Sequence, residues 1–532
     1  MMRPDFSKIA LFVSSLCVVS CGGTGQDVGS VNTNTATVSG VGIDGYLANA
    51  TVCLDTNENN KCDAWEPSDT TDNDGNFSFT TAITANDAVV RIKGGYDAQT
   101  NELFSGQITT RVDIENGQTL SNTAITPLTT LVTHASTAED RQKLLGALDI
   151  TEADLSIDYL QEENVNPGLL EKAILIHSIS KYLGDQLEDR YIELGEEGSA
   201  DNATGFIYES LVARLIENHT SNFVDTLTNE THLFSILEKA EDRLIINYQT
   251  AALTLPARLT TVGSSSSAGE ERAVELAKQI VQSIDHVFTP PTGAVSLNEA
   301  SAAVRVVEVL VQKALKEEAT ADTSITSYVA LLQDTSKTGE LLTELAKPNF
   351  DLGSLVTTQD FSNIETVKAS ATLGASALPL SNLPGKSILV DDPENSQPSE
   401  LKHARLELYF GGSSGATSGE LTACIRYIEG AASQSPKAAG DSDLDDGDTR
   451  GAYVKGTWKK FSDYSTLLSL RITDSGAPYE AIIKSAADKN GKKIFRFDFG
   501  DDLANWISTS GLTTAPTDKP DTDAECRARF NA

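Results

Sequence analysis

Hydrophobic and polar residues alternate in short runs over residues 38–122. The clearest run places Phe77 and Phe79 on one face, with polar residues between and beside them. A period of two is typical of strands with one buried face, so this segment predicts a module of short strands. The sequence DNDG at residues 72–75 predicts a hairpin turn directly before Phe77, because Asn, Asp and Gly tolerate the conformations that such turns need.

A helical period replaces the alternation over residues 123–385. Apolar residues recur every three or four positions in the stretches at residues 169–194, 206–227 and 233–248. Ser296 and Glu299 have the spacing of a helix capping box. Residues 263–269, GSSSSAG, predict a flexible loop between helices. We expect this region to be a central all-α helical bundle whose apolar stripes form its core.

Strand patterns return in residues 401–532. Leu406 and Leu408 lie on one face of a predicted strand, and further strand-like runs follow at residues 421–427, 464–472, 479–484 and 494–499. These runs predict an antiparallel sheet or small barrel. Residues 502–508 predict a short closing helix, and the polar, proline-bearing residues 386–400 predict a linker ahead of this domain.

Length and charge narrow the class of protein. At 532 residues the chain is too long for a single hydrophobic core, so several domains are expected. Charged residues make up 22% and apolar residues 39%, which is a globular composition. The net charge of −35 argues against nucleic acid as a partner, because binding to phosphates needs a basic surface.

The chain begins with a targeting segment. Arg3 and Lys8 flank a polar start, and the apolar run at residues 9–19 is too short to span a bilayer as a permanent helix. Ser20, a small residue, and then Cys21 follow the run, and this end of the segment resembles the lipobox of bacterial lipoproteins. The resemblance implies that residues 1–20 are a signal peptide and that the sulfur and amine of Cys21 are lipidated. The alternative is an ordinary signal peptide in which this cysteine is incidental.

The residues after Cys21 indicate in which membrane the lipoprotein is located. Gly22 follows Cys21, and by the sorting rule for such lipoproteins a residue other than Asp implies the outer membrane, on either face. Residues 21–37 are rich in Gly, Thr and Asn and predict a flexible tether. The bilayer is therefore an expected partner, held through acyl chains on Cys21.

Oxygen-bearing side chains recur through residues 55–66, DTNENNKCDAWE, in the order of the ligands in an EF-hand calcium loop. The predicted ligands are Asp55, Asn57, Asn59, the backbone carbonyl of Lys61, Asp63 and Glu66. Calcium takes six to eight hard oxygens in irregular geometry, so the spacing predicts a structural Ca²⁺ site. Asn60 stands where EF-hands have Gly, although Asn also tolerates the left-handed conformation of a sharp turn. The alternative is a solvated polar turn.

Cysteines outside the signal segment and the lipidation site suggest disulfides, because they are even in number and the protein is exported. They are Cys53, Cys62, Cys424 and Cys526, and they allow three pairings. We favour Cys53–Cys62 and Cys424–Cys526, because each pair then lies within one predicted domain. A zinc site is the alternative, but the spacings lack a CxxC pair and no His lies near either cysteine pair.

The sequence around the acidic loop, GIDGYLANATVCLDTNENNKCDAWEPSDTTDNDGNFSF, resembles the carboxypeptidase-regulatory-like and SdrD B-like modules of bacterial surface proteins. The resemblance covers about 85 residues and implies a β-sandwich over residues 38–122 with a calcium site in the loop. The expected fold class is then multidomain α+β. It comprises this sandwich, the central all-α bundle and a C-terminal antiparallel β domain.

The sequence has only weak matches to motifs of catalytic or further metal sites. The string GGSSG at residues 411–415 fits the GxSxG motif of serine hydrolases, but no His follows His403 and the next residues start a helix poorly. A nucleophile elbow needs both features. The acidic residues 441–448 resemble the start of a second calcium loop but lack a Glu at its twelfth position, and the alternative is a solvated turn. We therefore predict no catalytic residue.

The predicted function is that of a calcium-stabilised cell-envelope lipoprotein, acting as a binding or structural surface protein toward an unidentified protein or glycan. One alternative is an extracellular or periplasmic hydrolase, which a pocket with converging carboxylates would indicate. Another is a carrier of apolar small molecules, which a large apolar cavity between the helices would indicate.

Overall fold

The computed structural model describes most of the chain from residue 35 onward. The described residues are 35–60, 62–82, 85–98, 102–104, 106–161, 166–193, 203–248, 263–288, 296, 299–300, 302–307, 310, 321–334, 336–347, 361, 363–368, 380, 382–391, 402–429, 450–460, 465–471, 479–489, 492–498, 503–508, 511–517 and 519–531. Cys21, Lys61 and the acidic residues 441–448 lie outside them. The described part mixes helices with sheets, and it has a β region at the N-terminal end and an antiparallel sheet at the C-terminal end.

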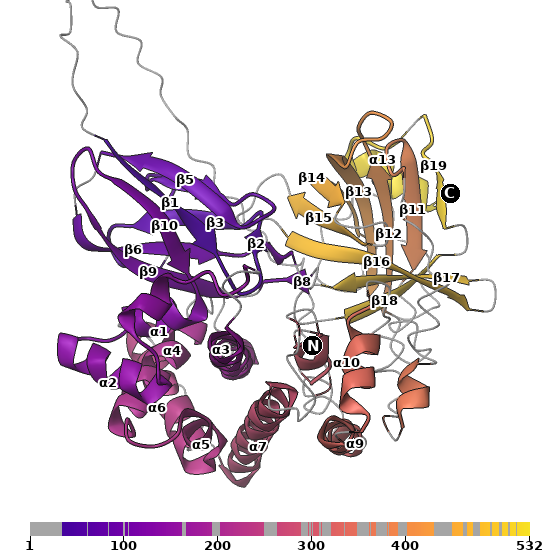
Figure 1. Cartoon of the computed structure of the whole chain (residues 1–532). Helices are drawn as coiled ribbons and strands as arrows, with labels where there is room; N and C mark the ends of the chain where they lie inside the picture. Colours follow the sequence, from indigo (N-terminus) through magenta and orange to yellow (C-terminus); the bar gives the residue numbers. More distant parts are fainter. Residues whose placement is uncertain are drawn as a thin grey trace, which may run out of the picture.

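Strands of the described N-terminal β region form two larger sheets and one small sheet (Figure 1). The first contains β1 (Ala36–Gly42), β5 (Asn76–Thr81) and β10 (Thr119–Ile125), in the order β10-β1-β5. The second contains β3 (Thr51–Asp55), β4 (Ser68–Thr70), β6 (Ala85–Lys93) and β9 (Gln107–Ile114), in the order β4-β3-β6-β9. The small sheet contains β2 (Leu47–Ala48), β7 (Tyr96–Asp97) and β8 (Glu102–Leu103). β1 pairs in parallel with β10 and antiparallel with β5.

The two larger sheets share one hydrophobic core. β5 buries Phe77 and Phe79 and exposes the residues between them, as the alternation predicts. The same core contains Val52 of β3 and Val90 of β6. Burying each such side chain contributes about 1.5–3 kcal/mol, so the core holds β3 firmly. The loop at residues 55–66 begins where this strand ends.

The turn at residues 72–75 connects β4 to β5, which belong to different sheets. Gly75 has φ +75° and donates its N–H to the carbonyl oxygen of Asp72. Oδ1 of Asp72 also accepts the N–H groups of Asp74 and Asn76. The turn lies where the sequence predicts it, but the predicted hairpin is wrong. The Asp72 side chain stabilises the turn locally and does not dictate how the flanking strands pair.

Helices occupy the described residues between β10 and the C-terminal sheet (Figure 1). They are α1 (Pro127–Thr133), α2 (Ala138–Leu148), the 3-10 helix η1 (Glu152–Ser156), α3 (Pro167–Glu193), α4 (Ala203–Glu217), α5 (Phe223–Thr228), α6 (Glu230–Tyr248), α7 (Gly263–Phe288), α9 (Ala321–Gln333) and α10 (Thr338–Leu345). Their apolar stripes bury Leu183, Leu211 and Ile280 in one core. The predicted capping box is present, because Glu299 accepts the N–H of Ser296 at 2.9 Å and returns its own N–H to the Ser296 hydroxyl at 3.3 Å.

Helix α7 begins at Gly263, so the flexible loop predicted over residues 263–269 is wrong. Ser and Gly are less favourable than Ala in a helix by about 1 kcal/mol or less. The later turns of α7 bury Val281 and Ile284. A helix anchored in this way tolerates unfavourable residues at its start.

One nine-stranded sheet, in which every neighbouring pair is antiparallel, and a last helix make up the described C-terminal residues. The elements are β11 (Lys386–Asp391), β12 (Lys402–Phe410), β13 (Ser418–Glu429), β14 (Arg450–Lys460), β15 (Ser465–Arg471), β16 (Tyr479–Lys489), β17 (Lys492–Asp498), β18 (Leu503–Ser508), β19 (Leu512–Thr514) and α13 (Asp523–Asn531). The order is β12-β13-β14-β15-β16-β17-β18-β11-β19, and β11 also pairs with β12. The sheet therefore curls back on itself.

Two predictions for this region are wrong. Residues 386–391, which the sequence predicts to be part of a linker, form β11, and this strand buries Ile388 and Val390 completely. The alternation of buried and other residues in this strand is short, and the acidic and proline residues that follow it in the sequence are typical of a linker. Residues 503–508, which the sequence predicts to be part of a short helix, form β18, where Trp506 lies opposite Phe495 of β17. Six residues are too few for a stable isolated helix, so pairing with a neighbouring strand decides their conformation.

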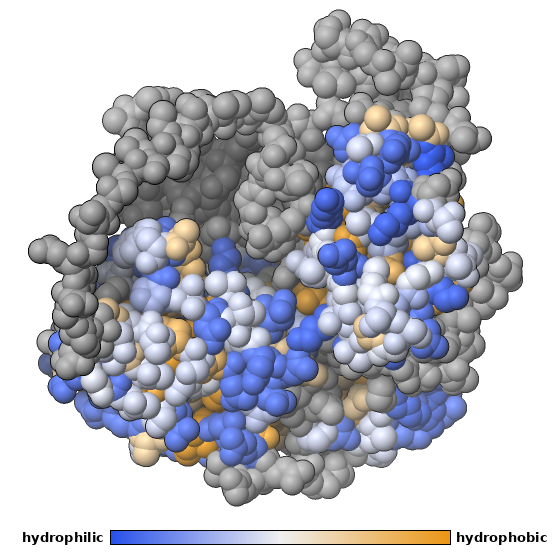
Figure 2. Space-filling model, turned by 90° about the horizontal axis from the view of Figure 1, so that it is seen from above, coloured by the Kyte–Doolittle hydropathy of each residue, from blue (hydrophilic) through white to orange (hydrophobic). Residues whose placement is uncertain are grey.

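The N-terminal β region and the C-terminal sheet lie side by side, and helices line the same side of both (Figure 1). At their contact, Tyr96 of β7 packs with Leu467 and Ile482 of the C-terminal sheet. Seen from above, hydrophilic residues cover much of the described surface, and hydrophobic residues form small separate areas (Figure 2). Among the described helices, none has the length and apolar character needed to cross a bilayer.

Candidate functional site

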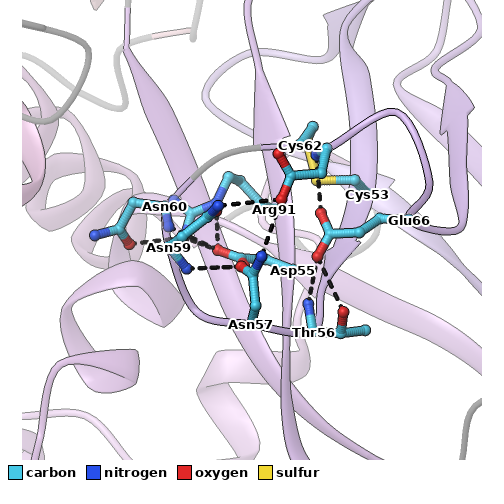
Figure 3. The surroundings of a disulfide bond; sticks show 10 residues. Cys53, Asp55, Thr56, Asn57, Asn59, Asn60, Cys62, Glu66 and Arg91 are labelled. Atoms are coloured by element: carbon cyan, nitrogen blue, oxygen red, sulfur yellow. Dashed lines mark hydrogen bonds and ion pairs between the residues drawn. A yellow bond between two sulfur atoms is a disulfide. The ribbon is translucent and has the colours of Figure 1, made fainter.

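A disulfide fastens the loop at residues 55–66 to the strand from which it starts (Figure 3). Cys53, a buried residue of β3, is bonded to Cys62 within the loop. The second disulfide, Cys424–Cys526, joins β13 to α13. Both predicted pairings are confirmed. Because these sulfurs are bonded to one another, they are not thiolate ligands for zinc.

Asp55 fixes the first turn of the loop. Its Oδ1 accepts the N–H of Asn59 at 3.2 Å, and its Oδ2 accepts the N–H of Asn60 at 3.0 Å. Asn60 has φ +63°, the left-handed conformation expected at the sixth position of an EF-hand-like loop. The backbone therefore follows the predicted turn although Asn replaces Gly.

The amide groups of Asn57 and Asn59 both point at Asp63. Their Nδ2 atoms donate hydrogen bonds to Asp63 Oδ2 at 2.9 and 3.1 Å. Asn57 Oδ1 also accepts the N–H of Asn59 at 3.0 Å. The structure thus brings the side chains predicted for the third, fifth and ninth positions together around one carboxylate oxygen.

Among the carboxylates that follow Asp55 in the loop, that of Glu66 is the most deeply buried, and the residue is 4% exposed. Its Oε1 accepts hydrogen bonds from the N–H and hydroxyl of Thr56 at 2.7 and 3.1 Å, and its Oε2 accepts the N–H of Asp63 at 3.0 Å. No ion pair to Glu66 is found within the described part of the chain. A buried carboxylate without a cation is costly unless hydrogen bonds or a metal compensate it.

Arg91 of β6 reaches the same loop, a contact that the sequence pattern does not predict. Its Nη2 lies 2.8 Å from Asp55 Oδ2 and 2.9 Å from Asn60 Oδ1. Burial lowers the pKa of the Arg91 guanidinium, while the hydrogen bond and charge of Asp55 oppose this shift, and the group stays charged. One feature of the sequence nevertheless indicates such a contact. Arg91 lies within the largely apolar run VVRIK, and a cation that is buried with such a run needs a partner.

The loop residues fit calcium in the type and number of their oxygens. The predicted ligand positions of this twelve-residue loop hold three carboxylates and two amides, and calcium accepts such a mixture. As arranged, the amides present N–H groups to Asp63, and in the described residues no three His, Cys, Asp or Glu side chains are grouped as metal ligands. An amide presents oxygen instead of nitrogen when it turns about its last bond, so binding would require Asn57 and Asn59 to reorient.

Arg111 of β9 connects the loop to the neighbouring elements. Its Nη2 lies 3.2 Å from Glu58 Oε2 and its Nη1 lies 3.1 Å from Asp87 Oδ2, while its Nε donates to the carbonyl oxygen of Thr133 in α1 at 3.2 Å. Glu58 is in the loop but is not a predicted ligand. These contacts tie the exposed side of the loop to β6 and α1.

Two of the six histidines of the chain, His134 and His177, are enclosed by the fold. His177 of α3 lies 3.4 Å from an Asp44 carboxylate oxygen and stacks on Phe104, with ring centres 5.2 Å apart. Burial, ahead of the charge of Lys181, lowers the pKa of His177 to about 3. Burial, ahead of the charges of nearby arginines, lowers the pKa of His134 to about 4. Both rings are therefore neutral core residues at neutral pH.

Ser413, the serine of the GxSxG string, lies in the loop between β12 and β13. Its carbonyl oxygen accepts the N–H of Ala416, and a strand rather than a helix follows. This geometry differs from a nucleophile elbow, in which the serine lies between a strand and a helix.

Comparisons of the chain with protein-family models, with curated proteins and with solved structures find no match.

Proposed function

We propose that the chain is a calcium-stabilised lipoprotein of the bacterial outer membrane, anchored through Cys21, that acts by binding a partner. The observation that carries the calcium assignment is the enclosure of Glu66, which is 4% exposed and has no ion-pair partner among the described residues. Buried carboxylates are usually paired with a cation or bound to a metal. Glu66 is also the residue at the twelfth position of the loop, where EF-hand loops have a ligating Glu.

Calcium would be held by Asp55, Asn57, Asn59, Asp63 and Glu66, with the carbonyl oxygen of Lys61. The ion supplies positive charge to carboxylates that otherwise repel one another. Arg91 holds Asp55 from the side of the sheet, and the Cys53–Cys62 disulfide limits how far the loop opens. The loop residues are thus kept near one another when the ion is absent, which reduces the ordering cost of binding.

We further infer that the two larger N-terminal sheets form a β-sandwich and that the central helices form a bundle. The core that the two sheets share supports the first inference, and the core that the helices share supports the second. The sandwich is then a stalk next to the tether, and the helical and C-terminal regions present a surface to a protein or glycan.

An exposed aromatic side chain within the loop supports a binding role. Trp65, adjacent to Glu66, is 63% exposed, and in the described part of the chain it is the one large hydrophobic side chain with high exposure. Tryptophan is enriched at the energetic centres of binding surfaces. No observation on the described residues favours the hydrolase or the carrier of apolar molecules.

Calorimetric titration of the chelator-treated chain with calcium tests the assignment. We expect saturable binding with a dissociation constant of about 10⁻⁴–10⁻³ M, as in extracellular calcium modules. Glu66→Gln should abolish it, because the amide keeps the size of the side chain but not its charge. Glu58→Gln is the matched control, since Glu58 is an exposed acid of the same loop. Equal titrations of wild type and Glu66→Gln would contradict the proposal.

A further inference from the structure

We infer that a polar cavity between β9, β10, α1 and η1 is a binding site for a neutral monosaccharide or a sugar residue of a glycan. The cavity is open to solvent and has a volume of about 300 Å³, at the lower end of the range for small-molecule sites. Its lining is mostly hydroxyl, amide and charged side chains, with a few apolar residues. The inference rests on the proposed binding function and names a class of partner for it, but it does not depend on calcium or on the anchor.

A β-bulge in β10 forms one wall of the cavity. Val38 of β1 pairs with Leu120, and Gly40 pairs with Thr123, so two residues of β10 lie opposite one residue of β1. The extra residue is contributed by the pair Ser121 and Asn122, and Asn122 adopts φ +62°. Bulges of this kind redirect side chains and are common beside functional sites. A left-handed non-glycine residue is also uncommon and often marks such sites.

The bulge, β9 and η1 contribute polar side chains that have no hydrogen-bond partner in the described part of the protein. The amide of Asn122 and the hydroxyls of Ser121, Thr123, Thr110 and Ser156 line the cavity, and none of these side chains makes a hydrogen bond to another described residue. Hydroxyls and an amide are both donors and acceptors, which matches the hydroxyl groups of a sugar. Their hydrogen bonds are therefore available to a ligand that displaces water.

An ion pair between Arg141 of α2 and Glu152 of η1 also lines the cavity. Arg141 Nε and Nη2 each lie 2.6 Å from a carboxylate oxygen of Glu152. The Arg141 hydrogen bond lowers the pKa of the Glu152 carboxyl, so this group is ionised at neutral pH. The two hydrogen bonds orient the Arg141 guanidinium and the Glu152 carboxylate relative to each other. Each group can still form further hydrogen bonds with a ligand.

Charge balance selects a neutral ligand over an anion. Arg111, the other cation of the cavity, is paired with Asp87 and Glu58. Glu152 balances Arg141. The site therefore has no unpaired cation to compensate a phosphate or carboxylate, and the chain as a whole is strongly acidic.

The test is calorimetric titration of the purified full-length chain with glucose, galactose, mannose and N-acetylglucosamine, and separately with inorganic phosphate. We expect saturable binding of at least one of these sugars and none of phosphate. Asn122→Gly removes the amide while glycine keeps the left-handed backbone, and Glu152→Gln removes the carboxylate charge. Each variant should weaken binding at least tenfold.

Asn382→Gly is the matched control, because Asn382 is an exposed asparagine with φ +59° outside the cavity. It should bind sugar as the wild type does. Three outcomes would overturn the inference: no sugar saturates the chain, both cavity variants bind like the wild type, or phosphate alone binds. A chain that binds calcium but no sugar overturns this inference and leaves the calcium proposal standing. Sugar binding that persists in Glu66→Gln shows that the cavity acts without the calcium loop.

Discussion

The guanidinium of Arg91 lies 2.8 Å from the carboxylate of Asp55, and the two side chains are only 3% and 0% exposed. Arg91 is in β6, whereas Asp55 is the last residue of β3. Asp55 therefore has two roles: it accepts the N–H groups that form the loop's first turn, and it neutralises a buried cation. Substituting Asp55 removes both roles, so the substitution does not report on calcium alone.

Asp55→Ala is expected to lower the free energy of unfolding by about 3–5 kcal/mol, because it leaves Arg91 buried and unpaired. Asp55→Ala combined with Arg91→Met should cost less than Asp55→Ala alone, since no isolated charge then remains buried. Denaturant unfolding in the presence of a chelator measures both values without a contribution from calcium. Additive losses in the double variant would show that the pair is not coupled.

The Cys424–Cys526 disulfide joins residues 102 apart in sequence, whereas Cys53–Cys62 joins residues 9 apart. In the chain-entropy model, removing the longer crosslink by paired Cys→Ala substitutions costs about 4–5 kcal/mol and removing the shorter one about 2.5 kcal/mol. Denaturant unfolding followed by circular dichroism is the measurement. A smaller loss for the longer crosslink would contradict the entropic account.

Helix α13 has a second attachment to the sheet. Arg529 donates from Nε and Nη2 to the Glu407 carboxylate of β12 at 2.6 and 2.9 Å. We therefore expect α13 to stay docked without the disulfide under native conditions.

The enclosed histidines make stability depend on pH. An unfolded histidine titrates near pH 6.5, whereas the pKa of folded His177 is about 3. Between these values the unfolded chain binds a proton that the folded chain does not, so stability falls as the pH falls from 6.5. The limiting slope is about 1.4 kcal/mol per pH unit for each such group, and it should be shallower here because 14% of the His177 side chain is exposed.

His177→Gln should flatten the dependence of the unfolding free energy on pH between 4 and 6.5. His219→Gln is the control, since His219 is exposed and hydrogen-bonds only within its own turn among the described contacts. The slope should be unchanged in that variant. The same slope in wild type and His177→Gln would show that His177 is not responsible.

The lipid anchor gives a prediction in cells. Cys21→Ser should move the chain from the membrane fraction to the soluble fraction, because the lipidated sulfur is lost. Cys17→Ser is the matched control, since Cys17 lies within the predicted signal peptide and is removed with it. Fractionation and immunoblotting measure the distribution. Retention of Cys21→Ser in the membrane fraction would require a different anchor.

Local chemistry made the loop predictable from the sequence. The turn at Asn60 and the Cys53–Cys62 disulfide both involve residues within ten positions of one another, and both are present as predicted. The buried alternation of Phe77 and Phe79 was predictable for the same reason, because it depends on neighbouring residues.

The features that could not be predicted from the sequence depend on pairing between strands that are far apart in the chain. Arg91 is 36 residues from Asp55, and their contact exists only because β6 pairs with β3. Residues 386–391 become a strand because β12 and β19 supply partners. The cavity is formed by a bulge between β1 and β10, whose parallel pairing has no local signature.

Thermal unfolding of the chain with calcium and with chelator tests the central claim most directly. At about 10 mM calcium and a dissociation constant of about 10⁻⁴–10⁻³ M, binding should add about 1.4–2.7 kcal/mol of stability to the N-terminal module. We predict that calcium raises the unfolding midpoint of the wild type and of Glu58→Gln but not of Glu66→Gln. Identical melting curves for the wild type with calcium and with chelator would contradict the account.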